Sequence, residues 1–115
     1  MKKHPVLDLF LKYATIDSKS GVNKKAHPTS PGQTKLIRMI ENDLLAHGVN
    51  ANQLRVLKDG SLLVHFPGTK NGKTVCYAAH VDTSPEAPGG GKCIIHNHKG
   101  GKIVLPKKGI VIPSK

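Results

Sequence analysis

The sequence predicts an α/β fold, and three patterns, taken in chain order, lead to this prediction. Two segments repeat apolar residues at the three- and four-residue spacing of an amphipathic helix. Two short apolar runs follow with a turn between them, as in a β-hairpin. A continuous apolar run comes next, which is typical of a strand covered on both faces. Helices followed by strands in one small chain favour a layered α/β architecture.

The first helix is expected over residues 5–16. Pro5 suits its first turn, because the amide hydrogen that proline lacks would have no partner there. The apolar residues of this segment share one helical face: Val6, Leu7, Phe10, Leu11 and Ala14. The polar residues 17–29 that follow are expected to form a loop.

The second helix has the clearest start signal in the chain. Ser30 as N-cap, Pro31 at the first position and Gln33 reaching back form a capping box. Gly48 is expected to stop this helix. Its apolar face consists of Leu36, Ile37, Ile40, Leu44 and Leu45.

Strand patterns begin after this helix. Residues 53–57 and 61–66 are short runs on either side of a turn at residues 58–60, which predicts a hairpin. Residues 75–79 form the continuous apolar run and are expected to be a buried strand. Beyond residue 84 the patterns are weaker, and the three apolar patches there are typical of short edge strands at most. They are residues 94–95, 103–105 and 110–112. A chain that ends on such patches is expected to be an incomplete domain.

Composition limits the function classes. The 115 residues suffice for one small domain, and 18 Lys and Arg against 7 Asp and Glu give a net charge of +11. Such a charge attracts nucleic acid, anionic lipid or acidic proteins. The lysines are scattered, however, and only 3% of the residues are aromatic. We therefore expect no specific nucleic-acid partner and no base-stacking surface.

Several features favour a cytoplasmic protein without a membrane partner. The basic N-terminus is not followed by the apolar stretch of a signal peptide, and no segment is long and apolar enough to span a bilayer. Two cysteines, Cys76 and Cys93, are too few for a disulfide framework and lack the spacing of a zinc ribbon.

One segment carries a chemical motif. His80 and Asp82 come directly after the predicted buried strand, at the edge where ligand sites form in open α/β sheets. A neutral histidine nitrogen can bind zinc, and a nearby carboxylate can fix its tautomer. The spacing alone leaves open a simple hydrogen-bonded pair. His96 and His98 could also lie near a metal, although a polar loop of this kind is more typical of solvated side chains.

The stretch AAHVDTSPE, residues 78–86, resembles the metal-ligand motif of the peptidase T family, tripeptide aminopeptidases among the M20 dizinc metallopeptidases. Other stretches resemble the same family in the same order. They are FLKYATIDSKSG, PTSPGQTKLIRMIENDLLAHGV, LKDGSLLVHFPG and IIHNHKGGKIVLPKKGIVIP. The resemblance covers nearly the whole chain. The family tends to have acidic residues where this chain has His96 and Lys102.

The resemblance implies a role for two residues. His80 matches a ligand of one zinc ion, and Asp82 matches the catalytic-site acid that orients this histidine. Residues 1–115 would be the N-terminal part of an M20-type catalytic domain, without the lid and dimerisation domain. A complete family member binds two Zn2+ ions and cleaves tripeptides, and a homodimer would need the missing lid.

The same resemblance implies that this chain is inactive alone. The family's bridging aspartate, general-base glutamate and remaining metal ligands come later than residue 115, and a catalytic zinc needs about three protein ligands. Two alternatives stay open. The chain is a non-catalytic remnant of a truncated reading frame, or it is a weak basic module that binds polyanions.

Overall fold

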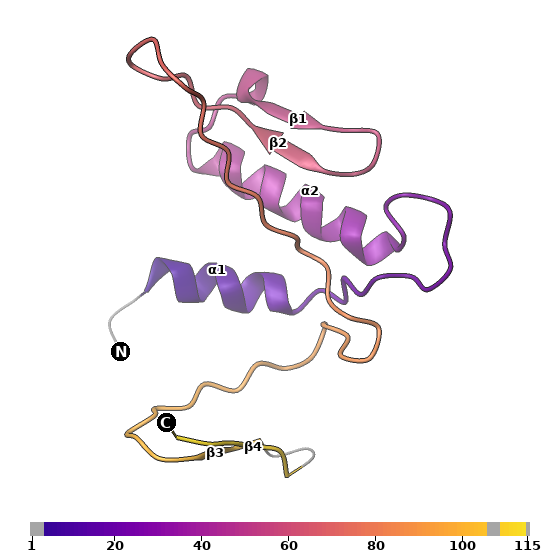
Figure 1. Cartoon of the computed structure of the whole chain (residues 1–115), viewed down its shortest axis with the longest axis vertical. Helices are drawn as coiled ribbons and strands as arrows, with labels where there is room; N and C mark the ends of the chain where they lie inside the picture. The colour runs from indigo at the N-terminus through magenta and orange to yellow at the C-terminus, as the bar shows by residue number, and fades with distance from the viewer. Residues whose placement is uncertain (1–3, 106–108, 115) are drawn as a thin grey trace.

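The computed structural model describes residues 4–105 and 109–114. It contains two α-helices, one short 3-10 helix and two small sheets, as expected of a small α/β fragment (Figure 1). The elements in chain order are α1 (Pro5–Ala14), α2 (Pro31–Ala46), the 3-10 helix η1 (Ala51–Gln53), β1 (Leu54–Val56), β2 (Leu62–Val64), β3 (Ile103–Val104) and β4 (Val111–Ile112).

Both predicted helices are confirmed. Helix α1 starts at Pro5 as predicted and ends at Ala14, before the expected residue 16. Helix α2 starts at Pro31, and the side-chain oxygen of Gln33 accepts a hydrogen bond from the Ser30 amide at 3.3 Å, as the capping pattern predicts. Within the described ranges, neither helix is long and apolar enough to cross a membrane.

The small core lies where the loop after α1 crosses the first turns of α2. Its buried residues are Ile16, Ser18, Leu36 and Ile37. Gly32 makes this crossing possible, because a Cβ atom at that position would lie 1.7 Å from the backbone oxygen of Asp17. The loop can therefore pass over α2 only if residue 32 has no side chain.

The predicted hairpin is confirmed by antiparallel pairing of β1 with β2, in which Leu54 lies opposite Val64. Its turn is where the sequence predicts it. The Ser61 amide donates to the Asp59 carboxylate at 2.9 Å, and Gly60 has a φ of +85° that suits glycine. Figure 1 shows the hairpin next to α2.

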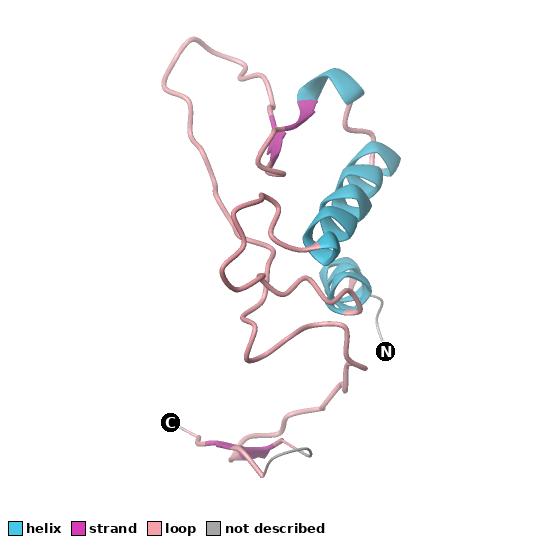
Figure 2. Ribbon diagram, turned by 90° about the vertical axis from the view of Figure 1, so that its right-hand side faces the viewer, coloured by secondary structure: helices cyan, strands magenta, loops and turns pink. Residues whose placement is uncertain are grey.

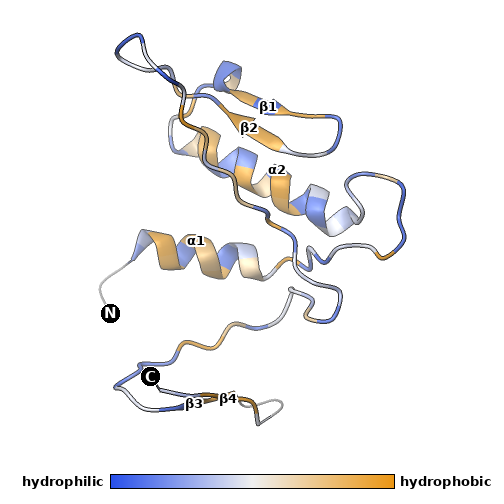
Figure 3. Cartoon of the chain, viewed as in Figure 1, coloured by the Kyte–Doolittle hydropathy of each residue, from blue (hydrophilic) through white to orange (hydrophobic). Residues whose placement is uncertain are grey.

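The predicted buried strand at residues 75–79 is wrong. The segment is irregular, Tyr77 is 94% exposed and Val75 is 71% exposed. A buried strand needs neighbouring strands at its edges and cover on both faces, and the described residues provide neither for this segment. In Figure 3 the loop before it is hydrophilic and the segment itself is partly hydrophobic.

The two apolar patches near the end of the described chain pair with each other. Strands β3 and β4 are antiparallel, with Ile103 opposite Ile112 and Val104 opposite Val111. Figures 1 and 2 both show this hairpin apart from the two helices. Residues 94–95 form no strand. The prediction of short edge strands is thus confirmed for two patches and wrong for the third.

Candidate metal-ligand site

His80 and Asp82 contact each other directly after the irregular segment at residues 75–79. The Nδ1 atom of His80 lies 3.2 Å from Oδ1 of Asp82 and 3.1 Å from its backbone oxygen. Because both oxygens accept hydrogen bonds, a neutral imidazole in this position carries its proton on Nδ1 and keeps the Nε2 lone pair free. A histidine that binds a metal through one nitrogen and donates from the other to a carboxylate has this arrangement.

The loop that follows α1 holds the motif in place. Lys19 and Thr83 form a parallel β-bridge, and the Ser20 amide donates to the Thr83 carbonyl at 2.9 Å. The hydroxyl of Ser18, which is buried, donates to the carbonyl of Val81 at 3.0 Å. The motif segment is therefore anchored by a neighbour distant in sequence, although residues 75–79 just before it are not.

The loop after the motif is anchored to the same place. The Thr83 hydroxyl accepts a hydrogen bond from the Gly89 amide at 3.2 Å, and the Gly90 amide donates to the carbonyl of Ala14 at 3.2 Å. The end of α1, the loop at residues 18–20 and the motif thus form one hydrogen-bonded unit.

Asp82 is held in its ionised form. Its carboxylate accepts a hydrogen bond from the Ser20 hydroxyl, and this bond, followed by the one from His80, keeps the pKa of Asp82 below its ordinary value. The side chain of Asp82 is 36% exposed and that of His80 is 85% exposed. An ionised, acceptor-only carboxylate at this position favours the His80 tautomer with a free Nε2.

A groove of about 780 Å³ opens beside the pair. Helix α2 and strand β2 line it with apolar side chains, and residues 78–82 pass along it. The apolar residues are Ile37, Ile40, Leu44, Leu62 and Val64. The lining of the groove is therefore mostly apolar, and the polar groups of Ser20, His80 and Asp82 lie along part of it.

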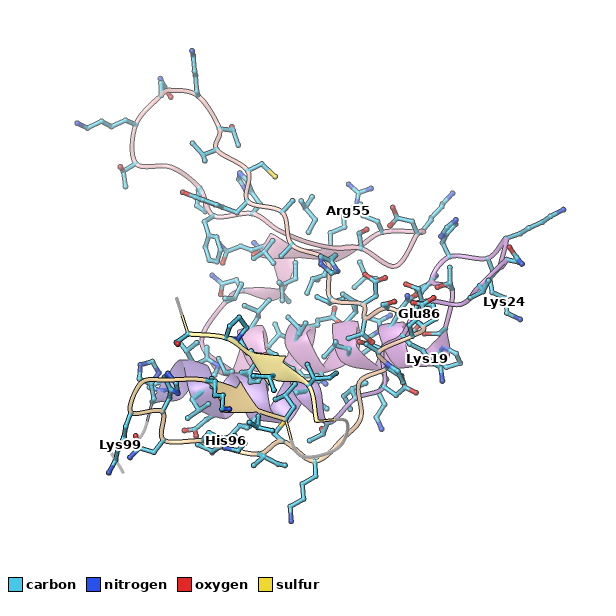
Figure 4. The ribbon with its side chains drawn as sticks, turned by 60° about the horizontal axis from the view of Figure 1, so that its bottom comes forward. Lys19, Lys24, Arg55, Glu86, His96 and Lys99 are labelled. Atoms are coloured by element: carbon cyan, nitrogen blue, oxygen red, sulfur yellow. The ribbon has the colours of Figure 1, made fainter. Side chains whose placement is uncertain are left out.

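The residues present fit one metal-ligand position and do not fit a complete zinc site. His80 offers one free ring nitrogen, whereas a catalytic zinc needs about three protein ligands. In the described part of the chain, no group of three or more histidine, cysteine or acidic residues is placed to hold a metal ion. The sequence also suggested His96 and His98 as possible ligands. Both are exposed, and Figure 4 shows His96 on the C-terminal segment.

Basic side chains lie on several parts of the described structure. Figure 4 shows Lys24, Arg55 and Lys99 projecting from separate parts of the molecule. The positive charge of the described residues is thus carried by more than one part of the molecule. Such a distribution attracts polyanions without orienting them.

Two residues of this unit were not singled out by the sequence. Ser18 and Ser20 lie in a polar stretch predicted only as a loop, and serines in loops are common. Their contacts with Val81 and Asp82 join positions more than sixty residues apart. A pattern of local spacing carries no signal for such a contact.

Comparison with known proteins shows which proteins this chain resembles in sequence. The sequence matches none of the protein-family models. Among curated proteins it is similar to peptidase T of Geobacillus sp. (strain WCH70), with 30% identity over 90% of this chain and 26% of the relative. Peptidase T of Geobacillus kaustophilus is 30% identical over 96% of this chain and 28% of its own length. Peptidase T of Edwardsiella ictaluri is 32% identical over 87% of this chain and 25% of its own.

These similarities confirm the resemblance found in the motifs. The chain spans about a quarter of the length of the curated relatives that it matches. Along nearly all of its own length, this chain is therefore similar in sequence to peptidase T, and it matches only a part of each of these relatives.

Proposed function

We propose that this chain is the N-terminal part of the catalytic domain of a zinc-dependent tripeptide aminopeptidase of the M20 type, and that it is inactive alone. His80 binds one of the metal ions, and Asp82 fixes the His80 tautomer. The complete enzyme is cytoplasmic, releases the N-terminal residue of tripeptides and dimerises through its lid domain. The observation that supports this proposal is the anchored His80–Asp82 pair within a peptidase T-like sequence.

The chain's own residues account for part of such a site. Asp82 accepts a hydrogen bond from the Nδ1–H group of His80, so that Nε2 is directed away from the carboxylate and its lone pair can bind a metal. Zinc, when bound by a full ligand set, supplies Lewis-acid activation of water and carbonyl groups. The other ligands and the general base belong to a part of the enzyme outside these 115 residues.

A chimera tests this proposal. Residues 1–115 would replace the matching quarter of the Geobacillus kaustophilus relative, and release of the N-terminal residue from a tripeptide would be assayed together with zinc content. We expect an active chimera, with His80→Ala lowering the rate roughly a hundredfold or more because a metal ligand is lost. The control is His65→Ala, which removes another exposed histidine and should leave both readouts unchanged.

Two results would contradict the proposal. Equal activity and zinc content in the chimera with and without His80→Ala would remove His80 from the metal site. Tripeptide cleavage by the purified 115-residue chain, dependent on zinc, would show that the chain is active alone.

The net charge of +11 favours a second candidate, which is weak binding to polyanions. Anisotropy of labelled DNA duplexes would test it. Sequence-independent binding that falls steeply with salt supports this candidate, and no binding at low salt eliminates it.

The remnant alternative has its own test, the mass of the native polypeptide. An antibody to residues 1–115 would capture the protein from the cells that make it. A product several times heavier than 12.3 kDa places these residues in a complete enzyme, and a product near that mass supports the remnant.

A further inference from the structure

The two carboxylate oxygens of Asp82 have different partners. Oδ1 faces Nδ1 of His80 at 3.2 Å, and Oδ2 accepts a hydrogen bond from the hydroxyl of Ser20. The three side chains are therefore linked by hydrogen bonds, with Asp82 between the serine and the histidine. No hydrogen bond in the described structure joins the serine hydroxyl to the imidazole, so Ser20 is not arranged as a nucleophile activated by histidine.

We propose that Ser20 is a positioning residue, whose hydroxyl holds the Asp82 carboxylate in the rotamer that presents Oδ1 to His80. The value of this positioning for metal binding rests on the function proposed above. The positioning itself is a property of these three side chains and can be measured without metal or substrate.

The backbone around Ser20 is fixed in register with the motif. The Ser20 amide donates to the Thr83 carbonyl at 2.9 Å, the Thr83 amide donates to the Ser18 carbonyl at 3.4 Å, and Lys19 is bridged to Thr83. These bonds place the Ser20 side chain beside that of Asp82 without requiring its hydroxyl. The backbone contacts thus fix the distance between residues 20 and 82, and the Ser20 hydroxyl fixes the orientation of the Asp82 carboxylate.

The hydroxyl matters because little else restrains the pair. The side chain of His80 is 85% exposed, and that of Asp82 is 36% exposed. The hydrogen bonds recorded for the His80 ring both go to Asp82. An exposed carboxylate without a second hydrogen bond samples several staggered rotamers, and the histidine would then lose its fixed acceptor.

Ser18 offers a matched control on the same loop. Its hydroxyl donates to the Val81 carbonyl at 3.0 Å and does not contact the Asp82 carboxylate in the described structure. Removing the Ser18 hydroxyl disturbs the support of the motif backbone. Removing the Ser20 hydroxyl disturbs the carboxylate. The two changes are equal in size and separate the two effects.

Solution NMR of the isotopically labelled full chain tests the proposal. Three-bond couplings report the χ1 rotamer of Asp82, and long-range nitrogen–proton spectra report the tautomer of His80. We expect a single Asp82 rotamer and the Nδ1–H tautomer in the unsubstituted chain. Ser20→Ala should average the rotamer and move His80 to the tautomer mixture of a free histidine. Ser18→Ala should keep the Asp82 rotamer, and Ser20→Thr should restore it because the hydroxyl is retained.

Several results would overturn the inference. An unchanged Asp82 rotamer and His80 tautomer in Ser20→Ala would show that the hydroxyl does not position them. Equal averaging in Ser18→Ala and Ser20→Ala, or collapse of the α2 amide signals in Ser20→Ala, would show a general structural role. Failure of Ser20→Thr to restore the rotamer would exclude the hydroxyl as the cause. Because no metal is used, each result is independent of whether His80 is a zinc ligand.

Discussion

Helix α2 and residues 75–79 both carry apolar side chains beside the same groove. The apolar residues at the start of the helix are buried, whereas Val75 and Tyr77 are exposed. Leu36 and Ile37 on α2 are 5% and 9% exposed, whereas Tyr77 and Val75 are 94% and 71% exposed. The helix satisfies its own backbone hydrogen bonds and needs cover on one face only. The extended segment needs partners at both edges and on both faces.

The difference comes from where the partners lie. The loop that covers the start of α2 belongs to residues 16–18, a short distance before the helix in sequence. Partners for an extended segment of a sheet come from distant residues. Among the described residues, distant contacts hold the motif where Ser18 and Ser20 meet it, whereas Val75 and Tyr77 stay largely exposed.

The same contrast explains the site. His80 and Asp82 lie at the end of the uncovered segment, yet their positions are defined because the loop at residues 18–20 pairs with Val81 and Thr83. The candidate ligand thus depends on the covered region. Changes that damage the crossing of this loop with α2 should damage the site, and changes in residues 75–79 should not.

The largest effect is expected from Gly32→Ala. A Cβ atom there would lie 1.7 Å from the Asp17 backbone oxygen, so the loop at residues 16–18 must move away from α2. Overpacking of this kind lowers the free energy of unfolding by about 3 kcal/mol. Urea unfolding of the full chain, followed by circular dichroism, measures it.

Gly72→Ala is the control for this substitution. No atom lies within 4 Å of a Cβ placed at Gly72, and its backbone is not in the left-handed region. We expect a change within about 0.5 kcal/mol. Equal destabilisation by the two changes would contradict the view that the crossing with α2 is the central contact.

A slightly smaller effect is expected from Leu36→Ala. Leu36 is 5% exposed, and removal of a buried leucine side chain lowers the free energy of unfolding by about 2–3 kcal/mol. Tyr77→Ala removes a larger side chain that is 94% exposed, and should change stability by less than about 0.5 kcal/mol. If Tyr77→Ala were the more harmful change in urea unfolding, residues 75–79 would be packed in solution.

The sequence predicted the elements that depend on neighbouring residues. Pro31 and Gln33 define the start of α2, and Asp59 and Gly60 define the hairpin turn, since each signal acts within a few residues. Residues 75–79 were predicted as buried because their apolar run matches a covered strand. The pattern is correct for such a strand, but burial needs distant partners that a local pattern cannot supply.

For the site, the sequence predicted the pair and missed its support. His80 and Asp82 stand two residues apart, so their contact follows from local geometry. Their proposed roles stay predictions. Ser20 could not be found from spacing, because the loop that carries it meets the motif only after the chain has folded.

A further prediction concerns the contact between the two helices. Lys12 on α1 donates to Asp43 on α2 at 2.5 Å, and this hydrogen bond is the main cause that lowers the pKa of Asp43 below 3.8. A lowered pKa stabilises the fold above that value, and the contribution is lost as the pH falls through the folded pKa. Asp43→Asn should therefore reduce the loss of stability in acid. Acid unfolding followed by circular dichroism measures it, with Asp8→Asn on the first turn of α1 as the control.

The smallest expected effect is a shift in the titration midpoint of Tyr13, a residue of α1 that lies beside Asp43 of α2. Burial, followed by the neighbouring Asp43 carboxylate, raises the pKa of Tyr13 to about 12 from 10.0. Its contribution to stability is therefore complete below the unfolded pKa and is lost as the pH rises through the folded value. The tyrosinate absorbance of the chain minus that of Tyr13→Phe gives the Tyr13 midpoint, and Asp43→Asn should lower it. A Tyr13 midpoint near 10.0 would mean that α1 does not pack against α2 at Asp43. The difference in burial between α2 and residues 75–79 would then rest on the loop crossing at Gly32 alone.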